Sequence, residues 1–94
     1  MRDEQFLTIA RAVADPTRLE ILSRIARSGE LACAHLVAEL AITPATISHH
    51  IKELTAAQLI DGRKEGRFFF YRLLPGVWLA YLRELARRVP APKS

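Results

Sequence analysis

The stretch TPATISHHIKEL, which begins at Thr43, constrains the fold of this 94-residue chain more than any other. Thr43 followed by Pro44 predicts the start of a helix, because threonine caps free N–H groups and proline suits the first helical position. Ile47, Ile51 and Leu54 recur at spacings of four and three residues, so one side of this helix is expected to be buried. The other side carries short polar groups, which favour close approach to another surface. These polar side chains are Thr46, Ser48, His49, His50 and Lys52.

Three helices are predicted ahead of this stretch. Residues 3–13 repeat apolar side chains on a helical period, and their apolar face is wide for an end segment, which favours burial against a partner. Asp15 followed by Pro16 predicts the start of a second helix, which ends near Gly29. A third, short helix is expected from about Ala32, and a tight connection joins it to the helix with the polar face. Two short helices in this arrangement are typical of a helix-turn-helix.

A β-hairpin is predicted over residues 59–73, where aromatic and β-branched side chains replace the helical pattern. Glu65 and Gly66 are expected to form its two-residue loop, with a basic residue on each side. Asp61 and Gly62 offer a competing turn signal. A turn there would leave the first strand too short to pair.

A last helix with a broad apolar face is expected from Pro75. It completes a winged helix-turn-helix, mainly α, with five helices and a β-hairpin wing. Residues 1–89 are predicted to form one domain, and residues 90–94 a flexible tail. The phenylalanines that begin at Phe68 are expected to pack under the wing rather than to stack on bases.

The charge distribution favours a polyanionic partner. The formal net charge is +4, and residues 1–42 are slightly acidic, so the positive excess lies in the second half of the chain. Lysine and arginine side chains that displace counterions from phosphates supply affinity for nucleic acid. No apolar run approaches the roughly 20 residues that cross a bilayer, and the first residues are charged rather than signal-like. We therefore expect no membrane partner and a cytoplasmic location, with which the lone cysteine, Cys33, agrees.

Three segments of the chain together resemble the ArsR family of bacterial transcriptional repressors, in the family's order and spacing. They are AVADPTRLEIL at 12–22, ATISHHIKEL at 45–54 and EGRFFFYRL at 65–73. The resemblance implies a homodimer joined through the first and last helices, with two recognition helices in successive major grooves of an inverted-repeat operator on double-stranded DNA. It also implies a regulator with no enzymatic activity and no cofactor, whose domain at 1–89 both binds DNA and dimerises.

The resemblance assigns site residues position by position. The candidates that face bases are Pro44, Ala45, Thr46, Ser48 and His49. Lys52 is better placed for a phosphate. The wing cations expected to reach the backbone or the minor groove are Arg63, Lys64 and Arg67. The candidates for the dimer interface are Phe6, Leu7, Ile9, Val13, Trp78, Tyr81, Leu82 and Leu85. Gln58 stands where the family commonly has glycine, so the conformation at the end of the recognition helix stays open.

The signal that such a regulator would sense is not evident in the sequence. Metal-sensing members carry two cysteines flanking one residue at the start of the third helix, but the matching positions are Ala32 and Ala34, with Cys33 between them. A soft metal prefers two or three thiolates, so the sequence predicts no metal site of this kind. Zinc-sensing members use aspartate and histidine on the last helix, and residues 75–89 contain neither.

Three alternatives stay open beside the released repressor. A lone Cys33 thiol could respond to oxidants if the N-terminus of a helix lowers its pKa. A metal-binding module could use Cys33, His35, His49 and His50. Adjacent residues on a helix point about 100° apart, however, and we expect His50 to be partly buried and hydrogen-bonded instead. A winged helix could also serve protein contact alone.

Overall fold

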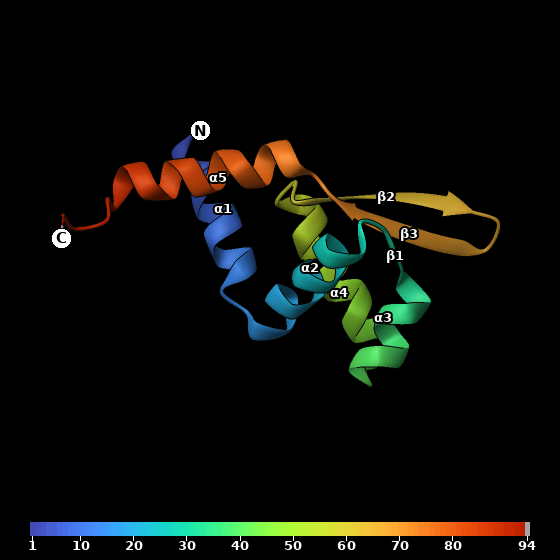
Figure 1. Cartoon of the computed structure of the whole chain (residues 1–94). Helices are drawn as coiled ribbons and strands as arrows, with labels where there is room; N and C mark the ends of the chain where they lie inside the picture. The colour runs from blue at the N-terminus through green and yellow to red at the C-terminus, as the bar shows by residue number, and fades with distance from the viewer. Residues whose placement is uncertain (94) are drawn as a thin grey trace.

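The computed structural model describes residues 1–93 and shows five helices and three strands within that range (Figure 1). The helices are α1 (Asp3–Val13), α2 (Pro16–Ser28), α3 (Cys33–Leu40), α4 (Pro44–Ala56) and α5 (Pro75–Arg88). The strands are β1 (Leu31–Ala32), β2 (Ile60–Glu65) and β3 (Phe68–Leu73). This order is that of a winged helix-turn-helix, so the fold predicted from the sequence is confirmed.

The hydrophobic core lies where α1, α2 and α4 meet the base of the hairpin. Its largest fully buried side chains are Ile9, Ile21, Ile25, Leu36, Ile47, Leu54, Leu59 and Ile60. Burial of one such side chain contributes roughly 1.5–3 kcal/mol to stability. Ile47 and Leu54 belong to the predicted apolar stripe of α4, and Ile51 between them is also buried. The stripe therefore decides which side of α4 faces outward.

The three strands form one antiparallel sheet in the order β1-β3-β2 (Figure 1). β1 pairs with β3 through Leu31 opposite Tyr71 and Ala32 opposite Phe70. The sequence analysis predicted no strand before the third helix, because a strand of two residues has no alternation of its own. The pairing attaches the start of α3 directly to the wing.

The loop of the hairpin differs by one residue from the prediction. Glu65 pairs with Phe68, so the two loop residues are Gly66 and Arg67, and the prediction of Glu65 and Gly66 was wrong. Gly66 has a φ of 60° and Arg67 has no positive φ, as in a type II′ turn, which requires glycine at the first central position. This register places the Arg67 side chain at the tip of the wing.

The end of α4 has the hydrogen bonds of a Schellman motif. The N–H of Leu59 donates to the carbonyl of Leu54 at 3.1 Å, and the N–H of Gln58 donates to the carbonyl of Thr55 at 2.9 Å. Gln58 accordingly has a φ of 61°, in the left-handed region. A non-glycine residue there is strained by roughly 1–2 kcal/mol.

α5 ends at Arg88, and residues 89–93 are neither helix nor strand. Ser94, the last residue of the predicted tail, lies outside the described residues. Within residues 1–93, no helix combines the length and the apolar character that crossing a bilayer requires.

Candidate nucleic-acid interface

α4 begins with the predicted cap, and a tight connection joins it to α3. The Thr43 hydroxyl accepts a hydrogen bond from the N–H of Thr46 at 3.2 Å and lies 2.9 Å from the Thr46 hydroxyl. Pro44 occupies the first turn. Ala41, which follows α3, has a φ of 51°, so the chain reverses within three residues. The Thr46 hydroxyl thus takes part in the helix cap and can also contact a ligand of this surface.

The outward side of α4 is open to solvent along its whole length. All the predicted contacts on this helix are exposed, namely Pro44, Ala45, Thr46, Ser48, His49 and Lys52. The buried stripe lies beneath them, so this polar surface rests on a rigid base. A helix with a fixed buried face and short exposed polar groups is suited to the major groove, which admits a helix and displays donors and acceptors on the base edges.

The two adjacent histidines of α4 lie in different surroundings. His49 is exposed, whereas His50 is 8% exposed. His50 was expected to be partly buried and hydrogen-bonded. It is buried, but its Nδ1 has no hydrogen-bond partner among residues 1–93. Within the same residues, no group of three potential metal ligands comes together. His50 is therefore part of the packing behind the polar surface.

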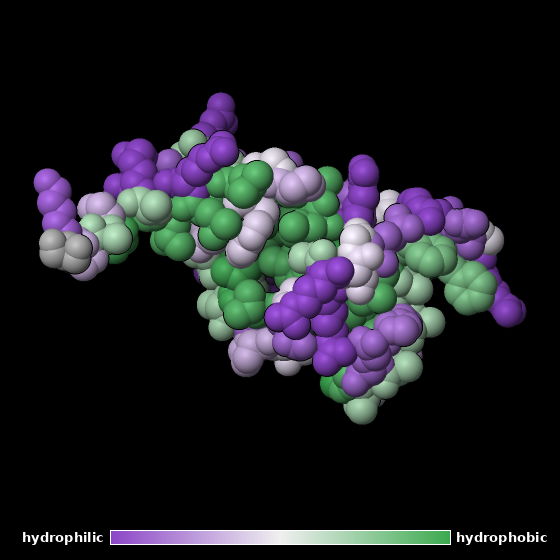
Figure 2. All heavy atoms as spheres, viewed as in Figure 1, coloured by the Kyte–Doolittle hydropathy of each residue, from purple (hydrophilic) through white to green (hydrophobic). Residues whose placement is uncertain are grey.

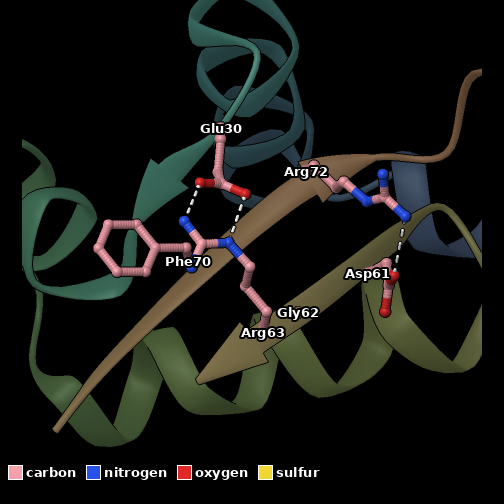
Figure 3. Close-up of a pocket in the computed structure, with 6 residues that line it drawn as sticks. All are labelled: Glu30, Asp61, Gly62, Arg63, Phe70 and Arg72. Carbon is pink, nitrogen blue, oxygen red and sulfur yellow. Dashed lines mark hydrogen bonds and ion pairs between the residues drawn. The ribbon is translucent and has the colours of Figure 1, made fainter. Parts of the chain in front are cut away.

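Arg63, predicted to contact DNA, is held by two carboxylates of the same chain, those of Glu65 and of Glu30, the second of which is drawn in Figure 3. Its Nε and Nη2 donate to Glu30 at 3.0 and 2.6 Å, and its Nη1 donates to Glu65. Its guanidinium also lies 4.7 Å from the ring centre of Phe70. The hydrogen bond from Arg63 lowers the pKa of the Glu30 carboxyl below its usual range, so the pair is charged at neutral pH.

A second ion pair lies on the same face of the hairpin. Arg72 donates to Asp61 at 3.3 Å, and the close-up shows this pair beside Arg63 and Glu30 (Figure 3). The two guanidiniums thus face three carboxylates, those of Glu30, Asp61 and Glu65. We call these two arginines and three carboxylates the base of the wing. As a group they carry no excess of positive charge.

The tip of the wing carries two cations of a different kind, those of Lys64 and Arg67. Neither has an ion-pair partner within the part of the chain that the structure describes. The Lys64 ammonium lies 5.9 Å from the ring centre of Phe69, and the Arg67 guanidinium lies 5.3 Å from that of Phe68. The tip therefore provides the cations of the wing that are available to a polyanion.

The predicted dimer residues divide into exposed and buried groups. Those with large exposed fractions are Leu7 at 47%, Leu82 at 41% and Leu85 at 39%. Val13 and Trp78 are half-buried. Phe6 and Tyr81 are mostly buried and pack on each other with ring centres 5.3 Å apart. Ile9 has no exposed surface in the single chain, so it supports this face from beneath.

Two exposed apolar residues escaped the sequence prediction, Leu79 on α5 at 48% and Val89, which follows α5, at 71%. Leu82, Leu85 and Val89 recur at spacings of three and four, which is the signal that could have included Val89. Hydrophobic atoms are visible along α5 and beside it (Figure 2). A stripe of this kind on the surface of a single chain marks an interaction surface.

An ion-pair cluster fixes α5 against α1. Arg88 donates to Asp3 at 2.6 Å and to Glu84 at 3.0 Å, and its guanidinium lies 4.1 Å from the ring centre of Phe6. Arg87 also donates to Glu84. The hydrogen bonds from Arg87 and then Arg88 lower the pKa of Glu84 to about 2. The two helices with the exposed leucines are thereby joined within one chain.

Cys33 is the first residue of α3 and is half-buried. Burial raises the pKa of its thiol, whereas a redox-responsive thiol requires a lowered pKa. The structure thus gives no support to the thiol response considered from the sequence.

Comparison with known proteins places this arrangement in a family. A model of a helix-turn-helix domain family matches residues 13–63. The arsenical resistance operon repressor of Staphylococcus xylosus is 36% identical over 73 residues, which span 78% of this chain and 69% of the repressor. A crystal structure of an ArsR family transcriptional regulator superposes with a TM-score of 0.83 at 26% identity, covering 94% of this chain and 90% of that one.

A solution structure of a homodimeric winged helix-turn-helix DNA-binding domain from Mycobacterium bovis has the same fold. Its TM-score is 0.74 at 23% identity, with 97% of this chain and 86% of that chain covered. The helix-turn-helix match, the relative at more than a third identity and the shared fold all agree with the three segments recognised in the sequence. This chain belongs to the ArsR family of winged helix-turn-helix transcriptional regulators.

Proposed function

We propose that this chain acts as a homodimeric repressor that binds an inverted-repeat operator and is released from it by a signal. The observation that carries the proposal is the outward side of α4, where short polar side chains are exposed above a fully buried apolar stripe. In this proposal Ser48 and His49 contact base edges, and Lys52 contacts a phosphate. The tip cations Lys64 and Arg67 bind the flanking backbone or minor groove.

The dimer is supported by the exposed apolar residues of α1 and α5. Leu7, Leu82 and Leu85 would each lose exposed surface against a second copy, and the homodimeric relative from Mycobacterium bovis has the same fold. A two-fold dimer presents two copies of α4, which matches an operator of two inverted half-sites. A DNA-binding regulator acts where the chromosome lies, so we place it in the cytoplasm.

The signal differs from the one sensed through paired thiolates. Ala32 and Ala34 occupy the positions of the two cysteines, and the Cys33 thiol between them has a raised pKa. Regulators of this family act by binding DNA, and we assign no catalytic step to this chain.

Alanine variants of Ser48 and His49 test the proposal. We expect each to weaken binding to DNA from upstream of the protein's own gene by about 1–3 kcal/mol and to relax specificity at one base pair. Fluorescence anisotropy with a labelled duplex and a scrambled competitor measures both effects. Thr55→Ala is the matched control, because Thr55 is exposed on the last turn of the same helix. Absence of binding to any duplex at low salt would instead favour a winged helix used for protein contact.

A further inference from the structure

Two phenylalanines at the wing tip do not pack into the hydrophobic core. Phe68 and Phe69 are each 47% exposed, although the sequence predicted that they pack under the wing. Tyr71 and Leu73, further along β3, pack against the core. The phenylalanines lie beyond the end of that packing, and large apolar side chains left open in this way mark a contact surface.

The strand register places the two rings next to each other at the free end of the hairpin. Phe68 pairs with Glu65 and Phe69 with Lys64, the last two pairs before the turn, and both rings line one hollow. Each ring has one unpaired cation near it, Arg67 beside Phe68 and Lys64 beside Phe69. Aromatic atoms are visible among hydrophilic ones toward the end of the hairpin (Figure 2). The tip is thus an apolar wedge with a positive charge beside each ring.

This wedge lies next to the helix that carries the proposed base contacts. Phe68, Phe69 and Arg67 line a hollow of about 370 Å³ together with Pro44, the first residue of α4. Cys33 and Val37 of α3 complete its wall. A duplex held by the first turns of α4 therefore passes beside the wing tip, and positive charge at the tip matches the charge of that duplex.

We propose that Phe68 and Phe69 are DNA contacts, whose rings pack against deoxyribose groups in the minor groove beside each half-site. The inference rests on the proposed function and adds to it a contact that depends little on salt. Both rings line the hollow beside Pro44, so a duplex bound by α4 brings its sugars next to them. Apolar side chains are common where proteins enter this groove. The rings supply apolar burial, and the neighbouring cations supply phosphate contacts.

The test compares a Phe68→Ala/Phe69→Ala double variant with Arg67→Ala across a series of salt concentrations. Loss of ring burial should reduce affinity for upstream DNA by about tenfold at every salt concentration and leave the slope of log affinity against log salt unchanged. Arg67→Ala should instead reduce the magnitude of that slope by about 0.9. Leu19→Ala is the matched control, since Leu19 is also 47% exposed but lies on α2.

Hydroxyl-radical footprinting supplies an independent readout, because the radical attacks deoxyribose in the minor groove. We expect the wild-type dimer to protect sugars at the outer end of each half-site and the double variant to lose that protection alone. Wild-type affinity and footprint in the double variant would overturn the inference. A change in its oligomeric state by sedimentation would also overturn it, and would assign the rings to contact between copies. If the wild type binds no duplex, the proposed function itself fails.

Discussion

The base and the tip of the wing carry equal numbers of cations, but those at the base are paired with carboxylates and those at the tip are not. At the base, Arg63 and Arg72 are neutralised by carboxylates of the same chain (Figure 3). At the tip, Lys64 and Arg67 lie over aromatic rings and have no carboxylate partner among residues 1–93. The difference shows that a count of basic residues overstates the charge available to a nucleic acid. A cation without an internal counterion can replace counterions of the duplex without first breaking an ion pair.

The largest expected effect comes from removing the two tip cations together. The Lys64→Ala/Arg67→Ala variant should bind any duplex about 60-fold more weakly near 0.1 M salt, because two lost phosphate contacts reduce the magnitude of the salt slope by about 1.8. The Arg63→Ala/Arg72→Ala variant should keep the wild-type slope. Anisotropy titrations of both proteins with one non-specific duplex make the comparison. Equal loss of slope in the two variants would show that base and tip do not differ.

A second experiment converts a base cation into a free one. Glu30→Gln removes the bidentate partner of Arg63 and leaves only Glu65 to hold it. We expect affinity for duplex DNA to rise by about three- to eightfold, with a salt slope steeper by up to 0.9. Glu4→Gln changes the net charge equally at an exposed site on α1, and it should leave the slope as it is. If both variants respond alike, overall charge rather than the Glu30 partner decides the outcome.

The smallest expected effect concerns the ion-pair cluster of α5. Its cations are paired with carboxylates, as at the base of the wing, but this pairing stabilises the folded chain. The pKa of Glu84 is lowered from its ordinary value near 4.5 to about 2 in the folded chain. Its contribution to stability is therefore complete above about pH 4.5 and is lost as the pH falls toward 2. Urea unfolding of the wild type and Glu84→Gln should give midpoints that differ at pH 6 and converge near pH 2. A difference independent of pH would contradict this assignment.

The helices were predictable because their signals are local. Thr43 with Pro44 and Asp15 with Pro16 mark starts that depend only on neighbouring residues, and the stripe of Ile47 and Leu54 follows from the helical period. The exposure of the predicted contacts on α4 follows from the same period. The loop was missed by one residue because a glycine fits either central position of a primed turn, and strand register decides between them.

The ion pairs of the wing could not be predicted, because the paired residues are distant from each other in sequence. Glu30 and Arg63 are 33 residues apart and meet only after β1 has paired with β3. Periodicity likewise identified the apolar residues of α1 and α5. It could not separate Ile9, which is fully buried within one chain, from Leu7, which is exposed. That distinction depends on the distance between two helices at opposite ends of the chain.

The short strand β1 has a mechanical consequence. Ala32 is paired with Phe70 of the wing, and the next residue in the chain is the first of α3. The start of α3 is therefore tied to the hairpin through the backbone pairing of β1 with β3. A displacement of the start of α3 would be passed through this pairing to the hairpin that carries Lys64 and Arg67.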